Sequence, residues 1–262
     1  MGNTFRAKSV KPPRALVINA GISKNAKIIN PAQTHKVKKF LFDIIYRDVL
    51  LWCNMKIKKE KFPILEYDPT SPPVVQPKNY LPKFVKQKCN KCLVTYFSDV
   101  VELYERVYKL NQVFKVRTEG VRPRVFLMKA GPSNEFIYVV PMAIGAPEAA
   151  RVIETMNAVG VEKFMVCGGA GTLDDAVTQG KVLIPTSALR DEGTSYHYLT
   201  PSREVALNPK VQKVIESVLG REKEPYAKVK TWTTDAIFRE TADKVALRKK
   251  EGCITVEMEC AA

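Results

Sequence analysis

The sequence has very few histidines: only His35 and His197 occur among its 262 residues. Imidazole is the commonest metal ligand in proteins, and two histidines supply few ligands for a histidine-based metal centre. One CxxC motif runs from Cys89 to Cys92, but no second CxxC or HxxxH accompanies it, and a zinc site of this kind needs such a partner. Two ordinary thiols are therefore expected there, with no bound metal.

Long apolar runs are also missing. No stretch reaches the roughly 18 residues needed to cross a bilayer, and the start, MGNTFRAKSV, lacks the apolar core of a secretory signal. Six cysteines without a secretory signal are expected to be free thiols in a reducing compartment. These features predict a cytoplasmic protein with no membrane span.

Acidic residues are scarce near the start of the chain. Residues 1–60 hold thirteen Lys or Arg and three Asp or Glu, a net +10 of the total +15. Such a segment is typical of a solvated basic arm, although it could also contact nucleic acid or an acidic membrane. We expect an N-terminal extension over 1–60, with a strand at Ala15–Ile22 and a helix at Lys39–Trp52, followed by one domain over 61–262. A nucleic-acid partner is not favoured.

Residues beyond 80 alternate between helical and strand-like patterns. This alternation predicts a three-layer α/β/α fold around a mixed, largely parallel central sheet. The expected helices are 99–111, with Val100, Leu103, Val107 and Leu110 on one face, 147–159, 208–219 ending at Gly220, and 241–250. The expected strands are 125–129, 136–142, 164–166, 181–189, 229–234 and 254–258.

The central block of the chain, Val161 to Pro201, combines two apolar strands with a glycine turn and a polar loop. The turn contains Gly168, Gly169 and Gly171, and glycine allows both sharp turns and close approach of a ligand to the backbone. After the second strand, RDEGTSYHY crowds charged and aromatic residues into one segment. The loop that leaves a strand of an α/β sheet is where ligands usually bind.

Four segments resemble the nucleoside phosphorylase superfamily, and its uridine phosphorylase branch in particular: GGAGTL at 168–173, RDEGTSYHY at 190–198, TDAIF at 234–238 and VEME at 256–259. In this order they cover roughly residues 62–262. The resemblance implies a pentosyltransferase of nucleotide salvage, which converts a nucleoside and phosphate into a free base and ribose 1-phosphate. It further implies a pyrimidine substrate such as uridine, phosphate as co-substrate without another cofactor, and a homo-oligomer, at least a dimer.

The resemblance also assigns roles to residues. Glu259 would grip the ribose hydroxyls with Met258 packed on the sugar and Glu257 in support, and a carboxylate suits this task because it accepts two hydroxyl hydrogen bonds. Arg190 and His197 would be catalytic beside Glu259. The predicted phosphate-binding residues are Gly168, Gly169 and Arg190, and the predicted base-binding residues are Ala170, Gly171, Ile237 and Phe238.

The residues alone leave simpler interpretations open. Glu257 and Glu259 could share a solvent face, the glycines could form a plain structural turn, and Ile237 and Phe238 could be core. Arg190 could pair with Asp191 or Glu192 in a salt bridge, and His197 could be structural.

Three departures from the family pattern keep other functions open. The segment EYDPTSPPVVQPK lacks the Gly-and-Arg phosphate turn expected near the first strand, and Val166 replaces the arginine found just before the glycine turn in uridine phosphorylases. The sequence ends at Ala262, where the family continues, so we expect the C-terminal part of the domain to be missing. A hydrolytic nucleosidase of the same fold and a non-catalytic nucleoside-binding relative are the alternatives.

Overall fold

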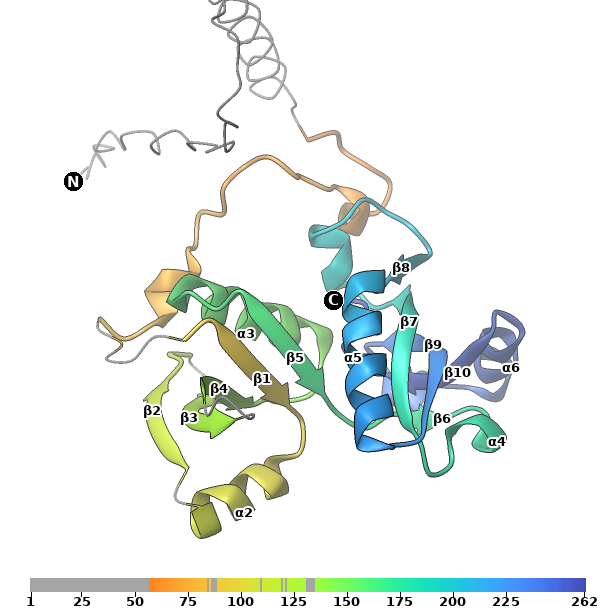
Figure 1. Cartoon of the computed structure of the whole chain (residues 1–262). Helices are drawn as coiled ribbons and strands as arrows, with labels where there is room; N and C mark the ends of the chain where they lie inside the picture. Colours follow the sequence, from red (N-terminus) through yellow and green to blue (C-terminus); the bar gives the residue numbers. More distant parts are fainter. Residues whose placement is uncertain are drawn as a thin grey trace, which may run out of the picture. The chain divides into compact units, whose positions relative to one another are not determined.

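The computed structural model describes residues 57–83, 85, 89–108, 110–118, 120, 122–130 and 135–262. The chain divides into two units, Met1–Met55 and Lys56–Ala262, and the described residues belong to the second (Figure 1). The expected strand Ala15–Ile22 and helix Lys39–Trp52 lie outside the described residues. The boundary that we expect at residue 60 is therefore still a prediction.

Within the described residues, ten strands form two five-stranded sheets. The first sheet has the order β2 (Asn111–Lys115), β3 (Arg124–Ala130), β4 (Glu135–Pro141), β1 (Lys91–Thr95) and β5 (Lys163–Cys167). The second sheet has the order β6 (Gly171–Thr172), β10 (Cys253–Glu257), β9 (Tyr226–Thr234), β7 (Val182–Asp191) and β8 (Glu204–Ala206).

Both sheets contain three parallel strands: the first adds antiparallel strands on one side only, at β3 and β2, and the second adds one antiparallel strand at each edge, β6 and β8. In the first sheet, Leu93 of β1 lies opposite Val139 of β4 and Met165 of β5, and all three strands run the same way. In the second sheet, Trp232 of β9 lies opposite Val256 of β10 and Leu189 of β7 in the same manner. The prediction of a mixed α/β sheet fold is thus confirmed, with the mixture divided between two sheets. Parallel strands place their carboxyl ends at one edge, where α/β proteins bind ligands.

Helices flank these sheets (Figure 1). The α-helices are α2 (Ser98–Tyr108), α3 (Ala146–Val159), α4 (Asp175–Thr178), α5 (Pro209–Glu222) and α6 (Ala242–Lys250), and the short 3₁₀ helices are η1 (Pro63–Leu65), η2 (Pro77–Tyr80), η3 (Thr194–His197) and η4 (Ile237–Arg239). The sequence predicted the bounds of α3 for a physical reason. Pro147 suits its first turn, and Gly160 adopts a φ of 110° that other residues avoid, which ends it.

Apolar side chains from β1, β4 and α3 form the core under the first sheet. Val94, Tyr138, Val140, Val152 and Met156 are completely buried there. Burying each such side chain contributes about 1.5–3 kcal/mol relative to exposure. The second sheet packs Trp232 against Leu189, Cys253 and Val256.

The structure corrects our prediction for helix α2. Three of the four residues that we expected on its packing face, Val100, Leu103 and Val107, are exposed, whereas Val101 is buried against Phe126 and Val139. The fourth, Leu110, packs against the same cluster from just beyond the helix. The apolar spacing predicted the helix, but the neighbouring strands select a different side of it. Helix α5 also differs, because it continues past Gly220 and ends at Lys223, which adopts the left-handed φ of 60°.

The first strand of the sheets was missed. Residues 91–95 form β1 in the middle of the first sheet, although we considered this segment only for its CxxC motif. The segment near Phe62, where we expected the family resemblance to begin, forms the short helix η1 and a turn in which Asp68 accepts hydrogen bonds from Thr70 and Ser71. The turn after the first strand is therefore Tyr96-Phe97-Ser98, not EYDPTSPPVVQPK.

Candidate active site

The predicted glycine turn connects the two sheets. Gly168, Gly169 and Ala170 lead from the end of β5 to the start of β6, and all three are exposed. A Cβ on Gly168 would lie 2.6 Å from Cδ2 of Tyr96, and a Cβ on Gly171 would lie 2.9 Å from Cγ1 of Val256. Close packing therefore requires glycine at both positions. The turn therefore packs against the ends of β1 and β10.

Glu257 ends β10 and organises the turn that follows it. Its Oε1 accepts hydrogen bonds from the hydroxyls of Thr233 at 2.6 Å and Thr231 at 3.3 Å. Its Oε2 accepts from the backbone N–H groups of Glu259 at 2.7 Å and Cys260 at 2.6 Å. Glu257 thus faces inward and is not part of a shared solvent face. It fixes the backbone on which Glu259 is mounted.

Glu259 reaches across to the first sheet. Its Oε1 accepts a hydrogen bond from the backbone N–H of Gly145, just before α3, at 2.5 Å, and its Oε2 accepts one from the N–H of Met258 at 3.3 Å. Burial raises the pKa of this half-buried carboxyl, and the nearby negative charge of Glu257 raises it further against the lowering effect of the Gly145 hydrogen bond. Each oxygen of a carboxylate accepts about two hydrogen bonds, so both oxygens keep capacity for a ligand.

Tyr96 lies beside these carboxylates, and the sequence gave us no reason to single it out. It follows β1, its backbone N–H donates to the carbonyl of Cys167 at the end of β5, and its ring contacts Gly168. Burial raises the pKa of its phenol, as do the carboxylates of Glu259 and Glu257. Recognising residues 91–95 as a strand would have placed Tyr96 at a carboxyl edge, and that was the available signal.

Arg190, by contrast, is enclosed in its own loop. Its guanidinium donates to the hydroxyls of Ser195 and Ser202, at 2.8 and 2.7 Å, and to the carbonyls of Thr200 and Leu199. The guanidinium also lies over the ring of Tyr196 at 4.2 Å, and the residue is only 4% exposed. It forms no ion pair with Asp191 or Glu192 within the described residues. Its predicted phosphate role stays a prediction, and these contacts hold the loop together.

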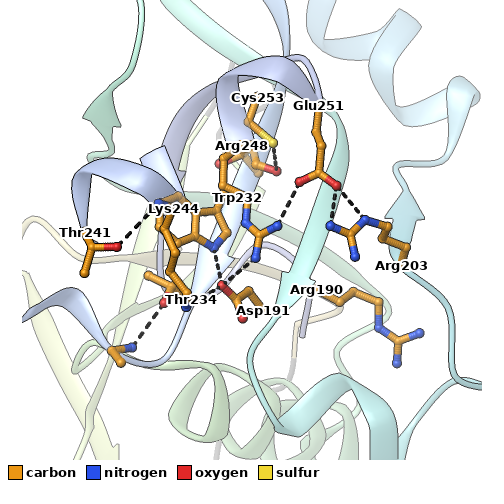
Figure 2. A network of polar contacts seen from close by, with 12 residues as sticks. Arg190, Asp191, Arg203, Trp232, Thr234, Thr241, Lys244, Arg248, Glu251 and Cys253 are labelled. Atoms are coloured by element: carbon orange, nitrogen blue, oxygen red, sulfur yellow. Dashed lines mark hydrogen bonds and ion pairs between the residues drawn. The ribbon is translucent and has the colours of Figure 1, made fainter. Parts of the chain in front are cut away.

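The carboxylates of Asp191 and Glu192 also form their hydrogen bonds within the protein. The Oδ2 of Asp191 accepts hydrogen bonds at 3.0 Å from Nε1 of Trp232, Nζ of Lys244 and a guanidinium nitrogen of Arg248 (Figure 2). Burial alone would raise the pKa of Asp191, but the hydrogen bonds from Lys244 and Arg248 outweigh it and hold the pKa below its ordinary value. Figure 2 shows the Arg190 side chain pointing away from this network.

The buried carboxylate of Glu192 accepts hydrogen bonds from the N–H of Thr194 at 2.6 Å, the N–H of Ser195 at 3.0 Å and the hydroxyl of Ser195. It therefore fixes the start of η3, on which His197 lies. The imidazole of His197 is exposed and forms no hydrogen bond to the side chain or backbone of another described residue. Its predicted catalytic role stays a prediction.

The predicted base-binding pair follows β9. Ile237 is 53% exposed and Phe238 is 96% exposed, so neither is core. Asp235 accepts a hydrogen bond from the N–H of Gly193 at 2.8 Å, which ties this turn to the segment after β7. Because β9 neighbours β10, and β10 pairs with β6 at Gly171, the turn around Phe238 and the start of β6 belong to the same sheet edge.

A cavity of about 400 Å³ opens elsewhere, between α3, β7 and the C-terminal residues. Its walls include Ile153, Ala188, Leu199 and Ala262, and they contain none of the predicted site residues. Its largely apolar lining includes Glu154 and residues 260–262, but neither Glu257 nor Glu259. The junction is thus the better candidate for chemistry on a polar ligand.

Among the described residues, no group of three or more His, Cys, Asp or Glu could hold a metal ion. In the CxxC motif, Cys92 belongs to the core of the first sheet, where burial raises its pKa to about 12, and the Cys89 thiol contacts the carbonyl of Lys91. In the part of the chain that the structure describes, no helix is long and apolar enough to span a bilayer.

Comparison of the sequence with curated proteins finds two phosphorylases among its relatives. The chain is 32% identical over 137 residues to a guanosine phosphorylase of Halorubrum lacusprofundi and 30% identical over 96 residues to a uridine phosphorylase of Thermococcus kodakarensis. These matches cover 52% and 36% of this chain, and 56% and 35% of the relatives. An uncharacterized protein of Acanthamoeba polyphaga mimivirus is 25% identical over 48% of each chain. The chain spans about half the length, or less, of these relatives.

Solved structures share the fold at low identity. A uridine phosphorylase from Vibrio fischeri superposes with a TM-score of 0.56 and 22% identity, over 67% of this chain and 72% of that one. An AMP nucleosidase from Bacteroides thetaiotaomicron gives a TM-score of 0.58 and 20% identity, over 70% and 77%. Residues 95–262 match the family description "Phosphorylase superfamily", so the match begins at the end of β1 and includes the four segments noted in the sequence. This chain belongs to the phosphorylase superfamily.

Proposed function

We propose that this protein cleaves the bond between the base and the ribose of a nucleoside, with phosphate as the acceptor of the ribosyl group. The products are a free base and ribose 1-phosphate. The observation that carries the proposal is Glu259, a half-buried carboxylate held where the two sheets meet by the N–H of Gly145 and by the turn that Glu257 fixes.

The chemistry of the reaction matches this carboxylate. As the glycosidic bond breaks, the ribosyl group becomes positive and the leaving base becomes negative. Glu259 would accept hydrogen bonds from the ribose hydroxyls and place negative charge near the developing cation, with Met258 against the sugar. Preorganised groups of this kind supply most of the stabilisation of a transition state, since they need no rearrangement when charge develops.

Phosphate would bind at the exposed turn of Gly168 and Gly169, whose backbone is open to solvent. The base would lie toward Ala170, Gly171, Ile237 and Phe238. Arg190 would help only indirectly in this proposal, because its donors already hold the loop. His197, exposed on η3, is the titratable group that the same loop could bring to the base.

A hydrolytic nucleosidase is the second candidate, and one observation favours it. Val166 stands just before the glycine turn, and the nearest arginine of the polar loop, Arg190, is enclosed by Ser195, Ser202 and two carbonyls. A site with so little free positive charge favours water over phosphate as the acceptor. A non-catalytic nucleoside-binding protein is the remaining alternative.

The relatives also bear on which base the nucleoside substrate carries. The expected preference for a pyrimidine, uridine in particular, agrees with the uridine phosphorylase relative, whereas the guanosine phosphorylase relative agrees with a purine. We keep uridine as the proposed substrate, and the experiment below includes both classes of base.

Release of free base from uridine, guanosine and inosine, each with and without phosphate, tests these proposals. Phosphate-dependent release from uridine, with ribose 1-phosphate as the second product, is the expected result. Release of the free base at the same rate with and without phosphate would establish the hydrolytic reaction instead. Binding of a nucleoside without release from any of the three would leave only the non-catalytic alternative.

We also propose that copies of this protein associate. Strand β5 is at the edge of the first sheet, and its Met165 and Val166 are exposed there. An apolar edge strand is a surface that proteins usually cover. Light scattering of the purified chain should give a mass of at least a dimer, and a stable monomer at high concentration would contradict this.

A further inference from the structure

Tyr96 is held rigidly and yet leaves one polar atom unused. Its backbone N–H donates to Cys167, and its ring is confined by Gly168, at which even a Cβ would collide with it. Its phenolic oxygen is buried and has no hydrogen-bond partner among the described residues. A buried hydroxyl without a partner costs about 1–3 kcal/mol. Buried polar groups in native proteins are almost always hydrogen-bonded, so this oxygen requires a partner that the described residues do not supply.

The surroundings of this oxygen restrict what its partner can be. The carboxylates of Glu259, Glu257 and Glu148 are close enough to raise the pKa of the phenol, after burial as the main cause. The phenol therefore stays protonated at neutral pH and offers one donor. Glu148 is ion-paired with Arg151, and the two remaining carboxylates favour a partner that donates as well as accepts. A neutral hydroxyl could accept from Tyr96 and donate to a carboxylate at once.

We infer that Tyr96 is a substrate-contacting residue that recognises a sugar hydroxyl of the bound nucleoside. The phenolic O–H donates to the oxygen of that hydroxyl, and the hydroxyl donates its own hydrogen to Glu259. The inference rests on the proposed function and adds a second protein group to the sugar site. It also explains why Gly168 is glycine, since a side chain there would displace the Tyr96 ring.

The Tyr96→Phe variant removes only the phenolic oxygen. Because no described residue bonds to that oxygen, the melting temperature without ligand should stay the same or rise. Binding of uridine and guanosine, measured by calorimetry, should weaken about tenfold, which corresponds to one lost hydrogen bond of about 1.4 kcal/mol. The loss should vanish for the 2′-deoxy or the 5′-deoxy analogue, whichever lacks the hydroxyl that Tyr96 contacts.

Tyr226→Phe is the matched control, because Tyr226 begins β9, at the opposite end of that strand from the site. It should bind every nucleoside as the unmodified protein does. Tyr96→Phe binding at unmodified strength would overturn the inference, as would a loss that is equal for all analogues or a lowered melting temperature without ligand. If the unmodified protein bound no nucleoside, the proposed function itself would fail, and this inference with it.

Discussion

Two segments of this protein begin at the ends of parallel strands and carry charged side chains in close succession: residues 190–198 at the end of β7, and residues 257–261 at the end of β10. In the first, the charged groups form hydrogen bonds within the protein. Arg190 bonds to its own loop, Asp191 to α6 and Glu192 to η3. In the second, Glu257 likewise accepts hydrogen bonds from the backbone, but Glu259 keeps free lone pairs beside a solvent-exposed turn.

This difference shows what distinguishes a binding group from a structural one. Both segments are polar, and both lie at the edge where ligands bind in α/β folds. A side chain whose hydrogen-bonding capacity is fully used within the protein has nothing left for a substrate, whatever its charge. Unused capacity at Glu259 and at the Tyr96 hydroxyl therefore carries more weight than the density of charged residues in the sequence. The four predictions that follow test this contrast.

Arg190→Met should have the largest effect, on stability. The change removes a buried guanidinium and leaves the Thr200 and Leu199 carbonyls without their donor. At about 1–3 kcal/mol for each buried group left unsatisfied, we expect a loss of about 3–5 kcal/mol in the free energy of unfolding. Urea unfolding followed by fluorescence measures it. Arg221→Met, at an exposed pair with Glu222, is the control and should change stability by no more than about 0.5 kcal/mol. A stable Arg190→Met protein that lost phosphate binding would reverse our interpretation of this loop.

Glu259→Ala should abolish most of the activity and leave the fold intact. Loss of the ribose contacts should cost about 2–4 kcal/mol of transition-state stabilisation, or roughly 30- to 1000-fold in kcat/KM. The raised pKa of this carboxyl means that burial costs its charged form more than the Gly145 hydrogen bond returns, so removing it should change the melting temperature little. Glu222→Ala, an exposed surface carboxylate, is the control. A Glu259→Ala protein with an ordinary rate would remove this residue from the site.

Asp191→Asn should cost about 2–3 kcal/mol, because Lys244 loses its counter-charge and Arg248 keeps only Glu251. The pKa of Asp191 is lowered in the folded protein, so its stabilising contribution is complete above its unfolded pKa, near 4, and is lost as the pH falls through the folded value. The stability difference between the variant and the unmodified protein should therefore shrink toward pH 3. A difference that stays constant from pH 7 to pH 3 would show that the charge contributes nothing.

Gly168→Ala should have the smallest effect, about 1–3 kcal/mol of destabilisation from the collision of the new methyl group with Tyr96. Gly169→Ala is the matched control, since nothing lies within 4 Å of a Cβ there. Thermal unfolding of both variants separates close packing from the general effect of losing a glycine. Equal stability of the two would mean that the Tyr96 ring moves aside easily, and the rigid position that we assign to it would be wrong.

The sequence indicated much of this architecture because the signals are local. Pro147 and Gly160 bound α3, Asn208 and Thr241 cap α5 and α6, and short apolar runs mark β5 and β7. Each of these depends on backbone preferences within a few residues. The four motif segments likewise identified the superfamily, which the comparison with known proteins then showed.

Other features depend on contacts between distant parts of the chain, and only the tertiary structure decided them. Neighbouring strands select which side of α2 is buried, and the fold brings Tyr96 against Gly168 and Gly145 against Glu259. Whether Arg190 binds a ligand or its own loop depends on where the Thr200 carbonyl lies after folding. The identity of a polar residue sets how many hydrogen bonds it can form, but the packing of the two sheets determines which of them remain for a substrate.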